Sequence, residues 1–255
     1  HYFCLGNQGW FFFRKIVQQW RALLGERKFV ISLFFGVTFV LLSLLFQKFA
    51  SRYVDSIPAA PVSDLILDHL PTFDFSFFFF IGYFVIMGMI VLYPLFFKPE
   101  LAPFTAKTFA AFVFIRAAFI TLTHIGAPQP LQEFLAHSQD YVFFVDWFFA
   151  NDLFFSGHTG TPFLAALIFW ENKVMRYFML LSSVVMAMTV LFMHLHYSID
   201  VFAAYFITYS IFVISDKIFN NLNRGFKRLV ARIEEREKFL GRVITKMRKK
   251  IEREV

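Results

Sequence analysis

The stretch FVISLFFGVTFVLLSLLF, which runs from Phe29 to Phe46, contains no charged residue and decides the class of this protein. A helix needs about 20 mostly apolar residues to cross the roughly 30 Å hydrocarbon core of a bilayer. Further apolar runs follow at 75–97, 108–126, 153–170, 174–195 and 199–214. The sequence therefore predicts an all-α, polytopic membrane protein with six transmembrane helices.

The composition agrees with this class. Hydrophobic residues make up 58% of the 255 residues and charged residues only 17%, whereas soluble domains have about 45–50% apolar and about 25% charged residues. This balance excludes an ordinary soluble globule and a disordered chain. The single cysteine, Cys4, excludes a disulfide framework and a multi-thiolate metal site.

Lys and Arg gather at alternate connections between the apolar runs, and cytoplasmic loops are the ones that carry such an excess. Both termini are therefore predicted to be cytoplasmic, and the acidic connections 47–74 and 127–152 to face outward. The net charge of +7 then follows from topology, without any nucleic acid. The cations that set this orientation are Arg14, Lys15, Arg21, Arg27, Lys28, Lys98, Lys107, Lys173, Arg176, Lys217, Arg224, Lys227, Arg228 and Arg232.

The chain divides into three predicted parts. Residues 1–28 form a cytoplasmic interfacial segment, residues 29–219 a six-helix catalytic domain, and residues 220–255 a basic amphipathic helix. Apolar residues recur at helical spacing through 222–251 with Lys and Arg between them, which is typical of a helix on anionic lipid. A coiled coil between copies of the chain is the alternative, so a homo-oligomer stays open.

Two short motifs contain the candidate chemistry. Ser156-Gly157-His158-Thr159 opens the fourth apolar run, and His196-Tyr197-Ser198-Ile199-Asp200 joins the fifth run to the sixth. The predicted topology puts both motifs at the same outer face, although they are far apart in sequence. This agreement between motif and sidedness favours a functional site over isolated interfacial histidines, which is the ordinary interpretation of His194, His69, His137 and His1.

The spacing of the second motif suits nucleophilic catalysis. His196 and Asp200 are four residues apart, so they share one face of a helical segment. A carboxylate on one ring nitrogen fixes the tautomer and leaves the other nitrogen as a nucleophile. His158 can then move the proton of the leaving group, and the backbone at Gly157 can approach a phosphoryl oxygen closely.

No metal or cofactor is expected. His194 and His196 are two residues apart and point to different helix faces, and the sequence shows no carboxylate cluster or multi-histidine ligand set.

Together, Asp152-x-x-x-Ser156-Gly157-His158-Thr159 and His196-Tyr197-Ser198-x-Asp200 resemble the paired signature of the sphingomyelin synthase family, a branch of the type 2 phosphatidic acid phosphatase superfamily. The resemblance covers roughly residues 29 to 216. It implies six spans, cytoplasmic tails and an active site on the outer or lumenal face. On this basis the catalytic residues are His158, His196 and Asp200, and the substrate-binding residues are Asp152, Ser156, Gly157, Thr159, Arg116 and Tyr197.

Two elements of that family are matched loosely or replaced. An Arg, a Thr and a Pro-x-Pro would correspond here to Arg116, Thr123 and Pro128-Gln129-Pro130. The Cys-Gly that precedes the Asp is replaced by Ala150-Asn151. These departures predict a divergent relative with its own substrate choice.

The phosphatase branch of the superfamily carries sequence elements that this chain lacks. Phe155 stands where that branch has a Pro. Two elements that contain an Arg are also missing: Thr189-Val190 stands in place of Ser-Arg, and Arg-Pro occurs nowhere. Such cations neutralise a phosphomonoester dianion. Their absence favours transfer of a phosphodiester headgroup, which carries one negative charge.

Two further features have alternative interpretations. Arg116 lies inside the third apolar run, where a charge is costly and marks a functional site by default; its expected partner is Asp152, Asp200 or the substrate phosphate, and a structural ion pair is the alternative. The aromatic cluster at Tyr141, Trp147, Phe148 and Phe149 fits an interfacial belt better than a cage for a quaternary ammonium.

The sequence thus predicts a lipid phosphotransferase. A phosphocholine or phosphoethanolamine headgroup would pass from a phospholipid donor, through a phosphohistidine, to a lipid alcohol such as ceramide. Water as acceptor would make a phospholipase C-like hydrolase or a lipid phosphatase with the same residues. A non-catalytic lipid-binding protein and a transporter are weaker alternatives, because His158, His196 and Asp200 are intact and ionisable residues deep in the spans are few.

Overall fold

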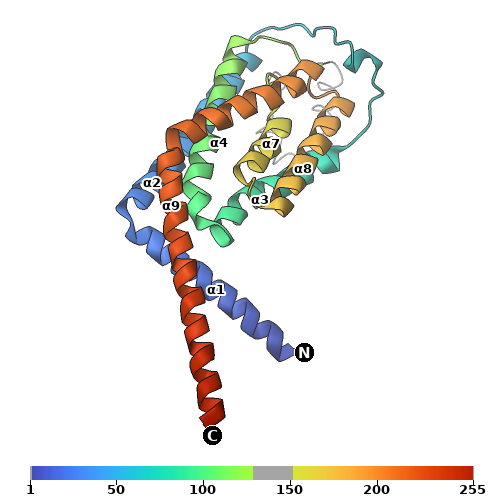
Figure 1. Ribbon diagram of the computed structural model, residues 1–255. Coiled ribbons are helices and arrows are strands. Elements are labelled where there is room, and N and C mark those ends of the chain that lie inside the picture. Colours follow the sequence, from blue (N-terminus) through green and yellow to red (C-terminus); the bar gives the residue numbers. More distant parts are fainter. Residues whose placement is uncertain (1, 129–151, 255) are drawn as a thin grey trace.

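The computed structural model describes residues 2–128 and 152–254, with side chains at 13–128 and 152–247. Most of these residues are helical, and the described residues contain no β-strand (Figure 1). Five segments among them are long and apolar enough to cross a membrane, which indicates an integral membrane protein. They are α2 (Arg27–Asp55), η2 with α3 (Phe78–Gly82 and Tyr83–Phe96), η3 with α4 (Pro99–Leu101 and Ala102–Leu122), α8 (Lys173–Phe192) and the first part of α9 (Ser198–Glu254).

The fourth apolar run, at 153–170, was predicted to be one of six membrane-spanning helices, but the helix that it forms is too short to span. It forms α7 (Gly157–Ile168), which has 12 residues and therefore extends about 18 Å at 1.5 Å per residue. This length is well below the roughly 30 Å of a hydrocarbon core. Helix α7 contacts α3, α4, α8 and α9, and nine of its 12 residues are buried. Its apolar side chains therefore form the protein core instead of a lipid-facing surface.

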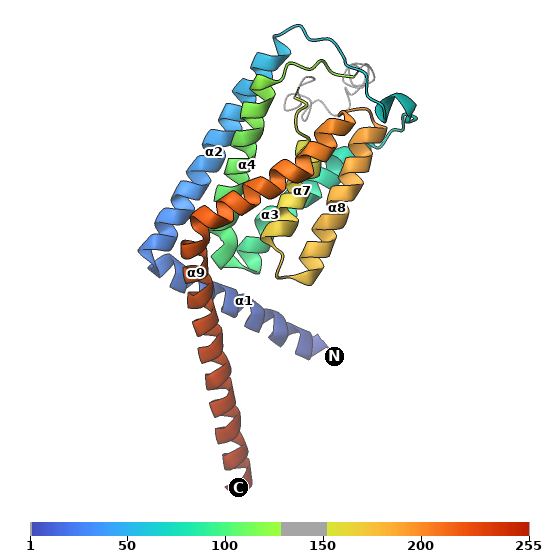
Figure 2. The same cartoon turned by 45° about the horizontal axis from the view of Figure 1, so that its top comes forward.

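The two terminal helices leave the bundle at the same end, away from the loop that joins α2 to η2, and diverge from there (Figures 1 and 2). Helix α1 (Tyr2–Gly25) and the last part of α9 project from the end of the bundle where α4 begins and α7 ends (Figures 1 and 2). The opposite end, here called the loop end, contains residues 56–77 and the turn 193–197. The terminal helices and the loop end therefore lie at opposite ends of the bundle (Figure 2).

The sixth apolar run and the basic tail form one continuous helix, α9, of 57 residues. The beginning of the tail packs against the start of α2, where Phe226 and Val230 join Leu23 and Phe29 in a small cluster. Part of the apolar face predicted for lipid or for a coiled coil is therefore used inside the chain. Further along, Phe239, Leu240, Ile244 and Met247 are exposed.

Local sequence explains where the helices around the site begin and end. Ser156 caps α7 by accepting a hydrogen bond from the Thr159 amide, as expected for a serine at this position. Helix α8 ends in a Schellman motif: the His194 amide donates to Leu191 and the Leu195 amide to Val190. His194 adopts a left-handed conformation with φ of 52°. The chain therefore leaves α8 in a sharp turn just before His196.

Large apolar side chains cover the outside of α2 and α3. On α2, Phe34, Leu41 and Leu42 are more than half exposed. Exposed apolar surface of this extent marks contact with a membrane or a partner. Together with the length of these helices, it fits a lipid-facing surface.

Candidate active site

The two sequence motifs meet at the loop end of the bundle. The Ser156 backbone N–H donates a hydrogen bond to the Asp200 carbonyl across 3.1 Å. This contact joins the start of α7 to the first turn of α9. His158 follows Ser156 by two residues, and His196 contacts Asp200. The structure therefore brings His158, His196 and Asp200 into one region.

His196 is paired with Asp200 as the four-residue spacing predicts. Nδ1 of His196 lies 3.4 Å from Oδ2 of Asp200, and both side chains are buried. The same carboxylate oxygen accepts the Tyr197 amide at 3.0 Å. A carboxylate at Nδ1 orients the imidazole and leaves Nε2 as the nitrogen available for reaction.

His158 packs between two aromatic side chains that sequence analysis did not identify. The ring of Phe79 stacks on the imidazole with centroids 4.2 Å apart, and Tyr83 lies 4.3 Å from it at an angle of 41°. Tyr83 is in turn within 3.3 Å of the Thr161 hydroxyl. Both rings come from a segment that begins with a π-helical turn, Phe78–Gly82, a feature that is frequent at functional sites. In a run so rich in Phe, no pattern singles out Phe79.

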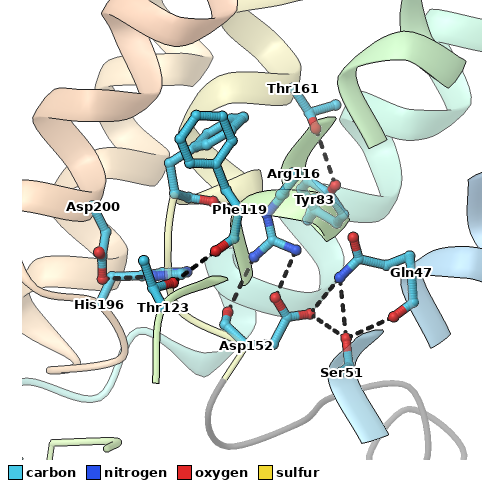
Figure 3. A network of polar contacts seen from close by, with 11 residues as sticks. Gln47, Ser51, Tyr83, Arg116, Phe119, Thr123, Asp152, Thr161, His196 and Asp200 are labelled. Atoms are coloured by element: carbon cyan, nitrogen blue, oxygen red, sulfur yellow. Dashed lines mark hydrogen bonds and ion pairs between the residues drawn. The ribbon is translucent and has the colours of Figure 1, made fainter. Parts of the chain in front are cut away.

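Arg116 is bound by the segment that leads into α7 (Figure 3). Its Nη1 pairs with Asp152 Oδ1 at 2.7 Å, Nη2 donates to the Asp152 carbonyl at 3.0 Å, and Nε donates to the Phe155 carbonyl at 2.8 Å. Of the three partners that the sequence left open, the structure shows Asp152. The guanidinium thereby fixes the position of the chain just before Ser156.

Asp152 connects this segment to α2 as well. Its Oδ2 accepts hydrogen bonds from Gln47 at 2.9 Å and from Ser51 at 3.0 Å (Figure 3). Gln47 and Ser51 are one helical turn apart and face the same side. They stand out in the sequence only as polar residues after an apolar run, with no sign of their distant partner.

The remaining predicted site residues lie in the same region, and each contacts neighbouring groups of the protein. Ser156 and Thr159 are fully buried, and the Thr159 hydroxyl donates to Ser156 at 3.2 Å. A Cβ at Gly157 would lie 3.2 Å from Nε of Arg116, so this glycine permits close approach of the guanidinium. The Tyr197 hydroxyl donates to the Gly126 carbonyl at 2.8 Å.

Among residues 2–128 and 152–254, no group of three or more His, Cys, Asp or Glu side chains is arranged to hold a metal ion. The aromatic cluster at 141–149, the residues Gln129-Pro130 and the pair Ala150-Asn151 lie outside the described residues.

Comparison with known proteins supports the superfamily. Residues 150–217 match a family model described as PAP2 superfamily C-terminal, which covers both motifs, α7, α8 and the first part of α9. This match supports the type 2 phosphatidic acid phosphatase superfamily and an enzyme of the lipid phosphatase or phosphotransferase type. Searches of curated proteins and of solved structures give no significant match.

Proposed function

We propose that this chain is a membrane lipid phosphotransferase that moves a phosphorylated headgroup from a glycerophospholipid to a lipid hydroxyl. The observation that carries the proposal is the meeting of the two motifs, with Ser156 bonded to Asp200 and Asp200 facing His196. The family match supports phosphoryl chemistry in general. The resemblance to sphingomyelin synthases favours phosphocholine or phosphoethanolamine as the headgroup and ceramide as an acceptor.

The mechanism uses His196 as nucleophile. Nε2 of His196 attacks phosphorus while Asp200 holds Nδ1–H, and the bond from phosphorus to the diacylglycerol oxygen breaks. His158, as the imidazolium, gives its proton to that oxygen. The products of this half-reaction are diacylglycerol and a phosphohistidine that carries the headgroup.

The second half-reaction reverses these roles. Neutral His158 accepts the proton of the acceptor hydroxyl, and the resulting oxygen nucleophile attacks phosphorus. The bond between phosphorus and Nε2 breaks, which restores His196 and the protonated His158. One headgroup has moved and no proton is gained or lost.

The contacts of Arg116 favour a diester over a monoester. Its three guanidinium nitrogens already bind Asp152 and Phe155, so much of its charge is committed to the protein. A phosphomonoester dianion needs more cationic neutralisation than a diester monoanion. Tyr197, Ser156, Thr159 and Gly157 are proposed to shape the substrate site around the histidines.

A hydrolase is the second candidate, because the superfamily match supports activity of the lipid phosphatase type as well as of the phosphotransferase type. Water would then replace the lipid hydroxyl in the second half-reaction and release the phosphorylated headgroup. The catalytic residues keep the same roles.

We further propose that both termini are cytoplasmic and that the site faces the extracytoplasmic side. The basis is the distribution of Lys and Arg, together with the position of the motifs at the end opposite the termini (Figure 2). Donor and acceptor would reach the site from the outer leaflet, with no added cofactor.

Product analysis tests the proposal. The purified full chain is placed in liposomes that contain phosphatidylcholine, phosphatidylethanolamine and ceramide, and every lipid is followed by mass spectrometry, with His196→Ala as control. A His196-dependent ceramide phospholipid together with diacylglycerol is expected. Diacylglycerol with only a water-soluble phosphorylated headgroup would identify a hydrolase, and no His196-dependent product would refute both.

A further inference from the structure

Asp64, in the loop between α2 and η2, binds the residue at the centre of the second motif. Its Oδ2 accepts the Ser198 backbone N–H at 2.6 Å, and the Ser198 hydroxyl lies 2.9 Å from Oδ1 and 2.8 Å from Oδ2. Asp64 and Ser198 are 134 residues apart in sequence. The Asp64 side chain is buried, so this is an internal contact of the protein.

The contact satisfies the start of α9. The first N–H groups of a helix have no partner inside the helix. Asp200 reaches back to the Tyr197 amide, and Asp64 accepts the next amide, that of Ser198. Two carboxylates thus cap one helix end, where the helix dipole stabilises negative charge.

The same loop binds the chain on both sides of His196. The Phe73 amide donates to the Phe192 carbonyl at 2.9 Å, and His194 Nε2 lies 3.1 Å from the Leu70 carbonyl. The Val62 amide donates to the Tyr197 hydroxyl at 3.1 Å. The turn that carries His196 is therefore held by the loop 62–73 before, beside and after the histidine.

The orientation of His196 depends on this turn. Asp200 contacts Nδ1 of His196 at 3.4 Å, near the long limit of a hydrogen bond. The same oxygen also binds the Tyr197 amide. A small shift of the turn would break one of these two contacts, and Asp64 restrains the turn at Ser198, between Tyr197 and Asp200.

We propose that Asp64 is a positioning residue for the His196–Asp200 pair, acting through Ser198. This inference rests on the proposed function for its kinetic consequence, while the structural coupling between Asp64 and the turn is tested separately. The hydrogen bonds of the Asp64 side chain go to Ser198 and to the loop amides of Ile66 and Leu67. Its substitution would therefore shift His196 without removing any of the reacting groups.

The charge and shape of Asp64 fit this role. Burial raises the pKa of the Asp64 carboxyl, but hydrogen bonds from the Leu67 amide, from Ser198 and from the Ile66 amide outweigh it. The pKa therefore lies below its usual value of 3.8. The carboxylate is ionised at neutral pH and can accept all these bonds. An asparagine would turn an N–H₂ group toward Ser198 or the loop amides and lose at least one of them.

The test measures kcat and KM for headgroup transfer in liposomes. Asp64→Asn is expected to lower kcat about 10- to 100-fold, since a displacement of about 1 Å can cost about 100-fold, and to leave KM within about threefold. Ser198→Ala keeps the hydrogen bond from the backbone N–H of residue 198 to Asp64, so its kcat is expected to fall less than that of Asp64→Asn. Because both act through one contact, the double variant should resemble Asp64→Asn alone.

Asp74→Asn is the matched control. Asp74 lies in the same loop and accepts the Ser76 amide and hydroxyl, but it does not touch the second motif. Its variant should keep the wild-type kcat. A kcat at the wild-type level in Asp64→Asn, or a loss of kcat that disappears on cooling below the melting transition, would overturn the proposal.

Hydrogen–deuterium exchange gives a readout that does not need activity. In Asp64→Asn, amides at 193–200 should exchange faster than in the wild type and in Asp74→Asn, while amides in α7 should not change. If the wild type shows no turnover, the proposed function fails, and exchange still decides the coupling. Unchanged exchange at 193–200 would overturn the role of Asp64 whatever the activity.

Discussion

The Ser156 amide donates to the carbonyl oxygen of Asp200 across 3.1 Å. Ser156 caps the helix that carries His158, and Asp200 holds His196. A single backbone contact therefore couples the proposed acid–base residue to the proposed nucleophile. Movement of α7 relative to α9 would disturb both histidines together.

Substitution of the two histidines by alanine should leave different amounts of residual activity. His196→Ala removes the nucleophile and should abolish turnover. His158→Ala removes general acid–base catalysis, which contributes about 100- to 10,000-fold, so traces of activity should remain. Product formation in liposomes measures both.

His124→Ala is the control for these variants, since His124 is an exposed histidine at the same end of the bundle. It should be fully active. All three variants should insert with the wild-type topology. Full activity in either His158→Ala or His196→Ala would remove the basis of the mechanism.

Removing Asp152 should destabilise the protein more than neutralising it. Asp152→Ala leaves the largely buried guanidinium of Arg116 without its carboxylate, and breaking a buried ion pair costs about 3–5 kcal/mol. Asp152→Asn keeps one side-chain oxygen that can accept a hydrogen bond from Arg116, Gln47 or Ser51. This variant should therefore lose less stability. Thermal unfolding in detergent measures the difference, and an alanine variant that melts with the wild type would contradict the structural role of this pair.

Gly160 should not tolerate a methyl group. A Cβ there would lie 2.8 Å from both the Phe112 ring and the Thr208 hydroxyl, so α7 would have to move away from α4 and α9. Overpacking of this kind costs about 1–3 kcal/mol. Gly160→Ala should therefore lower the melting temperature.

Gly88→Ala is the matched comparison in α3, where a Cβ would meet nothing within 4 Å among the described atoms. Because alanine in a helix interior is favoured over glycine by about 0.5–1 kcal/mol, this variant should be at least as stable as the wild type. Equal melting temperatures for both variants would show that α7 has room to move.

Acid should weaken the loop between α2 and η2. Hydrogen bonds from the Ser76 hydroxyl and amide lower the pKa of the exposed Asp74 carboxyl below its usual value of 3.8, and the pKa of Asp64 is lowered too. A carboxyl with a lowered pKa stabilises the fold above its unfolded-state pKa and loses that contribution as pH falls through the folded value. Stability should therefore fall below about pH 3.8.

The double variant Asp64→Asn/Asp74→Asn isolates this effect. It should show a flatter dependence of melting temperature on pH below 3.8 than the wild type. Identical slopes for the two proteins would mean that other carboxyl groups cause the acid sensitivity.

The sequence predicted the helical class and most helices because an uninterrupted apolar run of sufficient length has few alternatives in a membrane. It was wrong about the length of the fourth helix. An apolar composition does not distinguish a lipid-facing helix from one enclosed by other helices, and α7 is enclosed. The residues 153–155, although apolar, precede the helix, which begins at the Ser156 cap.

The proposed site was predictable where its chemistry is local. The four-residue spacing predicted the contact between His196 and Asp200, although His196 lies in the turn just before α9 and Asp200 in the first turn of that helix. The alternation of apolar runs and connections predicted that the two motifs lie at the same end of the bundle. Contacts between distant segments have no such periodicity. Gln47 with Asp152 and Asp64 with Ser198 depend on how the helices pack, so neither partner could be assigned from the sequence.

The contact between Asp64 and Ser198 also sets an order of events during biosynthesis. Domains form from the N-terminus as the chain is made, and Asp64 precedes its partner by 134 residues. Until residues 196–200 have been synthesised, Asp64 has no Ser198 to bind and the nascent chain lacks His196 and Asp200. The ribosome must therefore have made the chain up to residue 200 before the proposed catalytic centre can form, and we expect a translation product that ends before α9 to be inactive.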